Sequence, residues 1–190
     1  MAAFEHMMTL VSFVLALAIA HLLIGVVELV RAGDRVRHSW VHASWMAYGF
    51  LMAIAWWIGL WDLHVIAHWT TWSVLFNVLA VTTSYLFVAF VCPKVPETGT
   101  LDLEAFHNTN RRRYLGVAFA GSLLSGATAL IYGRLYDVPG QDIEIVGVGV
   151  GLVTLLIAYV FPNVWVQRIM AVVTLASLMF FFAVGDPVLT

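Results

Sequence analysis

The chain has 190 residues, of which 62% are apolar and 11% are charged, and its formal net charge is −2. Soluble domains carry roughly twice that share of charged residues, and a water-soluble fold of this size could not bury so much apolar surface. The small negative net charge also argues against the basic surface that a nucleic-acid-binding protein needs. The composition therefore predicts a protein surrounded by lipid, with no nucleic-acid partner.

Six apolar segments are long enough, or nearly so, to cross a bilayer, since about 20 apolar helical residues span the hydrocarbon core. The predicted spans, in chain order, are 7–30, 40–61, 70–92, 114–132, 145–161 and 164–184. The last two come from one long apolar stretch, which we divide at Pro162-Asn163 because this pair favours a turn. The short alternating strands of a barrel are not found in the sequence, so the predicted fold is an all-α transmembrane bundle of six spans.

The basic residues predict the orientation of this bundle. Eight of the nine belong to the connections after the first, third and fifth spans: Arg31, Arg35, Arg37, Lys94, Arg111, Arg112, Arg113 and Arg168. Positive connections stay in the cytoplasm. Because the number of spans is even, both termini are predicted to be extracytoplasmic.

Two ionisable residues lie within the first span, where charge is costly and a functional role is the default hypothesis. His21 is near the midpoint of the span, and Glu28 follows two helical turns later on the same face. His21 can titrate near neutral pH, so the two residues could line a proton or ion path. The alternative is structural, with His21 hydrogen-bonded to a neighbouring helix and Glu28 as an anchor at the membrane interface. A pair of Glu28 with His42 or with Arg31 is also expected to be within reach.

Polar residues of the third span could complete such a path. At the rise of a helix, Thr83 and Ser84 lie level with His21, and Asn77 shares a face with Ser84. A polar seam between the first and third spans is therefore predicted, with His42 of the second span at the depth of Glu28.

No cofactor is predicted. Asp62, His64 and His68 are a weak metal candidate, because the two histidines share a face only if that segment is helical and metal sites need three or four ligands. A haem with two axial histidines needs both at one depth on facing helices, and His21 has no such partner. A retinal Schiff base would need a lysine within a span, and the spans contain none.

No enzymatic activity is predicted either, because the sequence lacks nucleophile-elbow, zinc-peptidase and P-loop motifs. Small residues repeat instead: Gly121-Ser122 and Ser125-Gly126 in the fourth span, and Gly147 and Gly151 in the fifth. Such patterns let helix backbones approach closely, either within one chain or between copies.

Two strings, S-F-V-L-A-L-A-I-A-H-L-L at 12–23 and L-D-L-E-A-F-H-N-T-N-R-R-R-Y at 101–114, resemble segments of small multi-pass bacterial inner-membrane proteins. The resemblance covers roughly the first three predicted spans. It implies location in a bacterial inner membrane, and it carries neither a function nor a site residue to this chain.

Two functional hypotheses follow. The first is a channel-like or transporter-like homo-oligomer with a polar path near His21 and Glu28, at an interface between copies because six helices enclose few interior positions. The second is a non-catalytic accessory subunit of a larger membrane complex, which docks through the small-residue faces of the fourth and fifth spans. In both, the partners are lipid and another membrane subunit.

Overall fold

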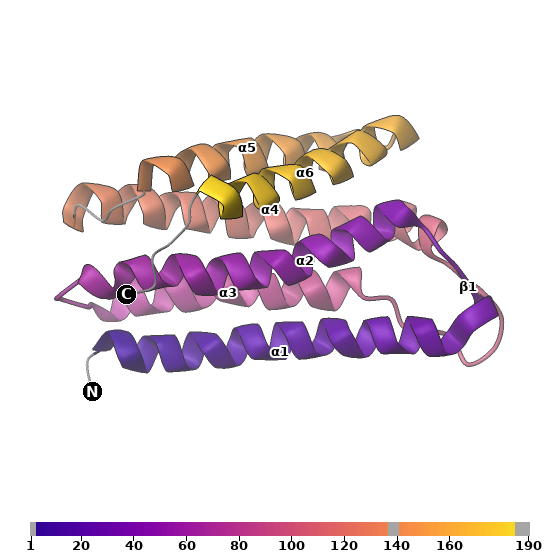
Figure 1. Cartoon of the computed structure of the whole chain (residues 1–190), viewed down its shortest axis with the longest axis horizontal. Helices are drawn as coiled ribbons and strands as arrows, with labels where there is room; N and C mark the ends of the chain where they lie inside the picture. The colour runs from indigo at the N-terminus through magenta and orange to yellow at the C-terminus, as the bar shows by residue number, and fades with distance from the viewer. Residues whose placement is uncertain (1–2, 137–140, 185–190) are drawn as a thin grey trace.

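The computed structural model of the chain is a bundle of long helices (Figure 1), and it describes the backbone of residues 3–136 and 141–184 and the side chains of 3–136 and 145–183. The helices are α1 Ala3–Ala32, α2 Trp40–Gly59, α3 Thr71–Val91, α4 Leu103–Tyr136, α5 Gln141–Val160 and α6 Val164–Val184. Two 3-10 turns, η1 Gly33–Arg35 and η2 Leu60–Val65, follow α1 and α2. The strands β1 Val36–Arg37 and β2 Leu101–Asp102 pair in parallel. The predicted all-α fold is confirmed.

Five helices of the described chain are long and apolar enough to cross a membrane: α1, α2, α3, α4 and α6. The apolar part of α5, Ile145–Val160, is shorter. The break between α5 and α6 falls at Pro162-Asn163, where the Asn163 side chain accepts a hydrogen bond from the Trp165 N–H at 2.9 Å. Several long apolar helices of this kind indicate a protein embedded in a membrane.

Five helices form a closed ring. α2 packs against α3, α3 against α4, α4 against α5, α5 against α6, and α6 returns to α2. α1 lies outside this ring at one edge of the bundle, where it packs against α3 and α2 (Figure 1). The centre of the ring is therefore built by α2 to α6.

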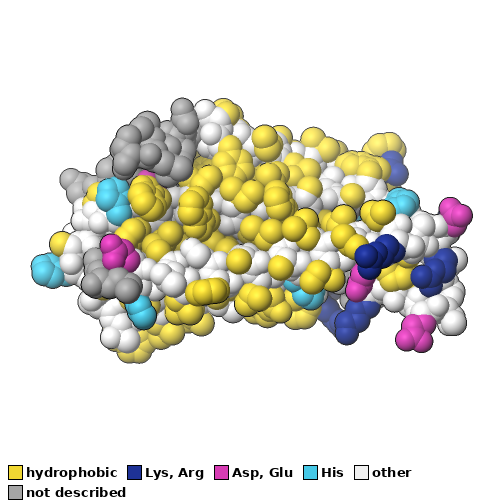
Figure 2. Space-filling view, turned by 60° about the horizontal axis from the view of Figure 1, so that its bottom comes forward, with side chains coloured by type: hydrophobic (Ala, Val, Ile, Leu, Met, Phe, Trp, Pro, Cys, Tyr) yellow, Lys and Arg dark blue, Asp and Glu magenta, His cyan; other side chains and the backbone are white. Residues whose placement is uncertain are grey.

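The pattern of burial along α1 agrees with this peripheral place. Its buried residues recur every three or four positions from Met7 to Leu29, which makes one stripe along the helix. On the other faces Phe13, Leu17 and Ile24 are exposed. Apolar side chains also cover much of the middle of the molecular surface in Figure 2. A belt of this kind suits contact with lipid.

Basic side chains gather at one end of the bundle (Figure 2). The chain turns there after α1, α3 and α5, while α1 begins and α6 ends at the opposite end (Figure 1). We call this the cationic end, and its exposed basic residues are Arg31, Arg35, Arg37, Lys94, Arg112 and Arg113.

α4 begins well before the predicted span 114–132, because Asp102 provides its N-cap. The Asp102 carboxylate accepts the N–H groups of Ala105 at 3.0 Å and Glu104 at 2.9 Å, and it lies 3.2 Å from the Arg37 guanidinium. The Ala105 N–H first, then the Glu104 N–H and Arg37, hold the pKa of Asp102 below its ordinary value. This one carboxylate joins the start of α4 to β1.

Candidate functional site: a cavity inside the helix ring

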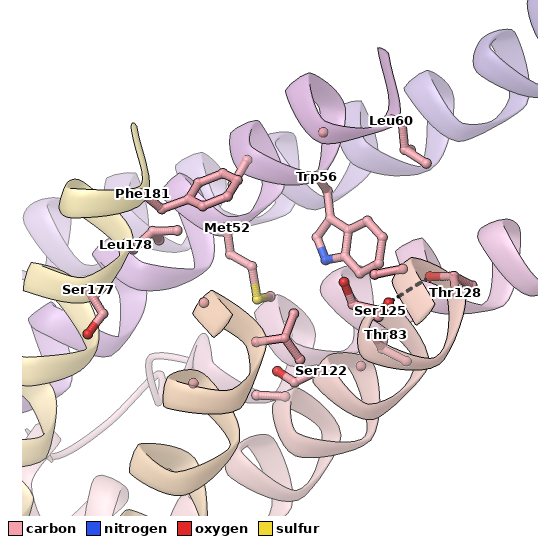
Figure 3. Close-up of a pocket in the computed structure, with 18 of the residues that line it drawn as sticks. Met52, Trp56, Leu60, Thr83, Ser122, Ser125, Thr128, Ser177, Leu178 and Phe181 are labelled. Atoms are coloured by element: carbon pink, nitrogen blue, oxygen red, sulfur yellow. Dashed lines mark hydrogen bonds between the residues drawn. The ribbon is translucent and has the colours of Figure 1, made fainter. Parts of the chain in front are cut away.

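A cavity of about 370 Å³ lies inside the ring of α2 to α6. This volume is near the lower end of the range of about 300–1,000 Å³ that is usual for small-molecule sites. All five ring helices and η2 contribute to its lining, and α1 does not. Figure 3 shows part of the lining. The side chains with polar atoms among the lining residues are Tyr48, Trp56, Asp62, Asn77, Thr83, Ser122, Ser125, Thr128, Tyr132, Thr154, Thr174 and Ser177.

The ring is tight where glycines of α4 meet its neighbours. A Cβ added to Gly121 would overlap the hydroxyl oxygen of Thr83 on α3 and lie 3.2 Å from the Thr83 Cβ. A Cβ added to Gly126 would lie 3.1 Å from a methyl group of Val148 on α5. These small residues, read from the sequence as packing signals for one chain or for several, pack helices together within one chain.

Gly151 of α5 has a different role. It lines the cavity, and a Cβ at this position would meet nothing within 4 Å. The missing side chain therefore adds space to the cavity and does not make room for a neighbouring helix.

Four threonines of the lining direct their hydroxyl hydrogens to carbonyl groups of their own helices. Thr83 donates to Ala80 at 2.5 Å and Thr174 to Met170 at 2.7 Å. Thr128 and Thr154 each donate to carbonyls three and four residues earlier, at 2.8–3.1 Å. A hydroxyl has one hydrogen and two lone pairs, so these groups keep acceptor capacity.

The end of the cavity away from the cationic end carries an amide, a phenol and a carboxyl group. Asn77 is buried, and its amide nitrogen donates to the Tyr132 hydroxyl at 2.6 Å and to the Ser73 carbonyl at 2.8 Å. Asp62 of η2 is half-buried. Trp56 of α2 points across the cavity toward Ser125 of α4 (Figure 3).

A layer of four rings separates the cavity from the cationic end. The Tyr48 ring lies 5.6 Å from the Phe87 ring and 5.8 Å from the Trp45 ring, and Tyr114 lies 5.8 Å from Phe87 and 6.4 Å from Trp45, all between centroids. All four side chains are buried. We call Trp45, Tyr48, Phe87 and Tyr114 the aromatic layer. Mostly edge-to-face contacts of this kind are favourable for buried rings.

Beyond the aromatic layer, a hydrogen-bonded network ties α4 to α5 and α6. The Tyr114 hydroxyl donates to His107 Nδ1, and His107 Nε2 donates to the Gln167 side-chain oxygen at 3.0 Å. The Gln167 nitrogen donates to the Ala158 and Phe161 carbonyls, each at 2.7 Å. Because both amide hydrogens bind carbonyls, the Gln167 oxygen must accept, which makes His107 the Nε2–H tautomer.

Arg111 completes this network at the end of α5. Its guanidinium donates to the carbonyls of Ala158 and Tyr159, each at 2.7 Å. The last carbonyls of a helix have no partner within that helix, so a buried helix end needs such donors. We call His107, Arg111, Tyr114 and Gln167 the polar network.

A second, smaller cavity of about 100 Å³ lies at the cationic end, on the other side of the polar network. His107 and Gln167 contribute to its lining. The remaining lining residues are His38, Ser39, Trp40, Val41, Glu104, Asn108, Val164 and Arg168. The aromatic layer and the polar network therefore lie between two cavities along the axis of the bundle.

The residues that the sequence placed on a path do not meet in one site. Asn77 and Thr83 line the central cavity. Ser84 and His42 are fully buried without lining it, and the Ser84 hydroxyl has no hydrogen-bond partner among the described residues. His21 and Glu28 do not line it either.

The predicted polar seam between the first and third spans is wrong, because the polar face of α3 is turned to α4. Asn77 bonds Tyr132 of α4, and Thr83 contacts Gly121 of α4. His21 is exposed on α1, with the edge of its ring toward Tyr85 at 6.1 Å between centroids. Helical rise gives the depth of a residue in the membrane but not the direction of its side chain around the helix axis. His21 therefore lies at the depth of the polar residues of α3 without facing them.

The proposed partners of Glu28 are also wrong. Glu28 is exposed on α1, whereas His42 is fully buried on α2, so the two side chains do not pair. Glu28 forms no ion pair with His42 or Arg31. Among the described residues, the ion pair at the cationic end joins Arg37 and Asp102.

The condition for the weak metal candidate at Asp62, His64 and His68 is not met. The α-helix ends at Gly59, and the 3-10 turn that follows ends at Val65, before His68. His64 Nδ1 lies 2.8 Å from the Trp61 carbonyl oxygen. Over residues 3–136 and 141–184, no group of three or more His, Cys, Asp or Glu side chains is placed to hold a metal ion.

Sequence reasoning missed the polar network. Its three members on α4, His107, Arg111 and Tyr114, are four and three residues apart, so they share one face of a helix. The spacing is visible in the sequence, but the polar residues before Tyr114 make this segment resemble a connection between spans. Gln167, an uncharged polar residue in the last predicted span, was a further signal.

Comparisons of the chain with protein-family models, with curated proteins and with solved structures found no match.

Proposed function

We propose that this chain is a transporter-like protein of a bacterial inner membrane, with six spans, that binds a small solute in its central cavity. The observation that supports the proposal most is that the cavity lies inside a closed ring of helices and ends at the aromatic layer. The solute route thus lies within the ring and not along His21 and Glu28.

A transporter accounts for this arrangement better than an open channel does. A channel needs a continuous water path, whereas the four packed rings of the aromatic layer interrupt the axis of this bundle. A transporter exposes a central site to one side at a time, with a closed barrier on the other. Cavities on both sides of such a barrier suit the same scheme.

The orientation follows from the basic residues. The cationic end is placed in the cytoplasm by the positive-inside rule, so the ends of α1 and α6 that lie opposite are extracytoplasmic. A homo-oligomer remains part of the proposal, but the route does not need an interface between copies, because the cavity lies within one chain.

Filling the cavity tests the proposal. Proteoliposomes with the unmodified protein or with a variant are loaded with a mixture of small hydrophilic amines, alcohols and carboxylic acids. Mass spectrometry measures how much of each solute the vesicles retain over time. Gly151→Phe places a ring in the cavity without a clash, since a Cβ there meets nothing within 4 Å. Gly149→Phe is the matched control, because a Cβ at Gly149 is equally unobstructed but this residue does not line the cavity.

We expect a protein-dependent loss of at least one solute that Gly151→Phe abolishes and Gly149→Phe retains. Retention of every solute by vesicles with the unmodified protein would reject transport and leave the accessory subunit as the better hypothesis. Equal loss with both variants would show that the route lies elsewhere.

A further inference from the structure

We infer that the central cavity selects small organic cations with N–H groups, such as protonated primary amines. This inference rests on the proposed function of the cavity and adds the chemical class of the solute. It is carried by the hydrogen-bond directions of five lining side chains, by the charge of Asp62 and by the aromatic side chains of the same lining.

The hydrogen-bond directions of five lining side chains favour a donor as ligand, although the hydroxyls of Tyr48, Ser122 and Ser177 and the indole N–H of Trp56 can donate as well. The hydroxyl hydrogens of Thr83, Thr128, Thr154 and Thr174 point to carbonyls of their own helices. The amide hydrogens of Asn77 are used by the Ser73 carbonyl and the Tyr132 hydroxyl. What these five side chains offer to a solute is therefore oxygen lone pairs. An ammonium group has three donors and no acceptor, and so it complements such a lining.

Asp62 adds a negative charge to the same cavity. Its carboxyl group is half-buried, and it forms no ion pair with any described residue. Eight of the nine Lys and Arg residues belong to the cationic end, at the opposite end of the bundle (Figure 2). The ninth, Arg134, is exposed in the last turn of α4, and His64 is the charged-group neighbour of Asp62, but neither forms an ion pair with it. A carboxylate that is partly removed from water gains from a cation brought close to it. A protonated amine supplies that cation.

Aromatic side chains line the cavity on the α2 and α6 sides. Trp56 and Phe181 both project into the region shown in Figure 3, and Tyr48 lies at the inner end. Organic cations are attracted to the faces of aromatic rings, most strongly to indole. A carboxylate solute would meet the lone pairs of the threonines and the charge of Asp62, so the same lining disfavours anions.

Three probes of one size separate charge from shape: phenethylammonium, 2-phenylethanol and phenylacetate. Their binding to purified protein in mild detergent is measured by equilibrium dialysis, with Gly151→Phe as the baseline for uptake by micelles. We expect phenethylammonium to bind about tenfold more tightly than 2-phenylethanol, and phenylacetate to bind no more than to the baseline.

Asp62→Asn should weaken phenethylammonium binding about tenfold and leave 2-phenylethanol binding unchanged, because only the charge is removed. Asp62→Glu keeps the charge and should keep the preference, which controls for damage to the fold. Asp34→Asn, an exposed carboxylate near the cationic end, should change neither.

Two results would overturn the inference in different ways. Equal binding of phenethylammonium and 2-phenylethanol, or ammonium binding that Asp62→Asn leaves intact, would reject the solute class while the cavity remains a binding site. Binding of no probe above the Gly151→Phe baseline, together with the absence of any cavity-dependent flux, would reject the proposed function as well.

Discussion

Gln167→Leu tests whether the polar network holds α5 and α6 to α4. The substitution removes one bond from His107 and two to the Ala158 and Phe161 carbonyls. These losses are unequal. Phe161 is 53% exposed, so water can reach this part of the chain, and Ala158 keeps its bond from Arg111. His107 is 2% exposed and loses the partner of its Nε2–H.

The expected cost is therefore governed by one buried donor, with a smaller contribution from the lost carbonyl bonds. A buried group left without its partner costs about 1–3 kcal/mol, and hydrogen bonds between membrane helices average about 0.6 kcal/mol. We expect Gln167→Leu to lower the free energy of unfolding by about 2 kcal/mol. Far-UV circular dichroism during titration of mixed micelles with SDS measures this quantity.

A double-mutant cycle with Arg111→Met makes the test sharper. Gln167 and Arg111 both donate to the Ala158 carbonyl, and Ala158 is fully buried. Either single variant leaves that oxygen one donor, whereas the double variant leaves none. The double variant should thus cost about 1 kcal/mol more than the sum of the two single variants. Asn110→Leu is the control, because among the described residues that amide bonds the Phe106 carbonyl of its own helix and no other helix.

Additivity within about 0.5 kcal/mol would show that the two side chains act independently, which contradicts the shared carbonyl. A loss below about 0.5 kcal/mol for Gln167→Leu, no larger than the loss for Asn110→Leu, would show that the network does not hold these helices.

Three further predictions concern packing, pH and orientation. Gly121→Ala should lower the free energy of unfolding by about 1–3 kcal/mol in the same SDS titration, because the added Cβ overlaps the Thr83 side chain of α3. Gly116→Ala should lower it by less than about 0.5 kcal/mol, because a Cβ there lies 3.6 Å from the nearest atom. Because its N–H partners and Arg37 hold the pKa of Asp102 below its ordinary value, the cap should be present at neutral pH and be lost only in acid, as the pH falls through that lowered pKa. Hydrogen exchange at the start of α4 would show this, and loss of protection already at pH 5 would contradict it. In a cysteine-free background, an impermeant thiol reagent should reach Thr109→Cys only from the cytoplasm and Ala67→Cys only from outside, and the reverse pattern would reject the orientation.

Composition and the lack of short alternating strands were together enough to predict the all-α fold. A chain with 62% apolar residues needs lipid, only helices or barrels satisfy the backbone there, and the strand pattern of a barrel is not found in the sequence. The start of α4 was not predictable in the same way. Hydropathy reports where a helix meets lipid, whereas α4 begins at Leu103, where Asp102 accepts the first N–H groups. The segment before residue 114 is polar enough to look like a connection and is nevertheless helical.

The site was only partly predictable, for a geometric reason. Polar residues in a span stand out in a sequence, and two of those singled out, Asn77 and Thr83, line the cavity. A single sequence gives their depth from helical rise, but not which helix they face. Which helix a side chain faces depends on the order of α2 to α6 around the ring, and in this order α3 packs against α4. Gly151 is a second case that one sequence cannot decide. A small residue in a span can allow a neighbouring helix to approach closely or can leave space for a cavity, and at Gly151 it leaves space.

If the chain transports a solute as proposed, the aromatic layer must open, and its composition indicates which contacts must change. Two of its rings belong to α2, one to α3 and one to α4, so α5 and α6 contribute none. At this level Gly49 of α2 lies against Phe87 of α3, where an added Cβ would come within 2.9 Å of the ring. Tyr114, by contrast, belongs both to the aromatic layer and to the polar network through His107. Displacing Tyr114 therefore opens the barrier and breaks the bond to His107 in one movement, which couples the barrier to the position of α5 and α6.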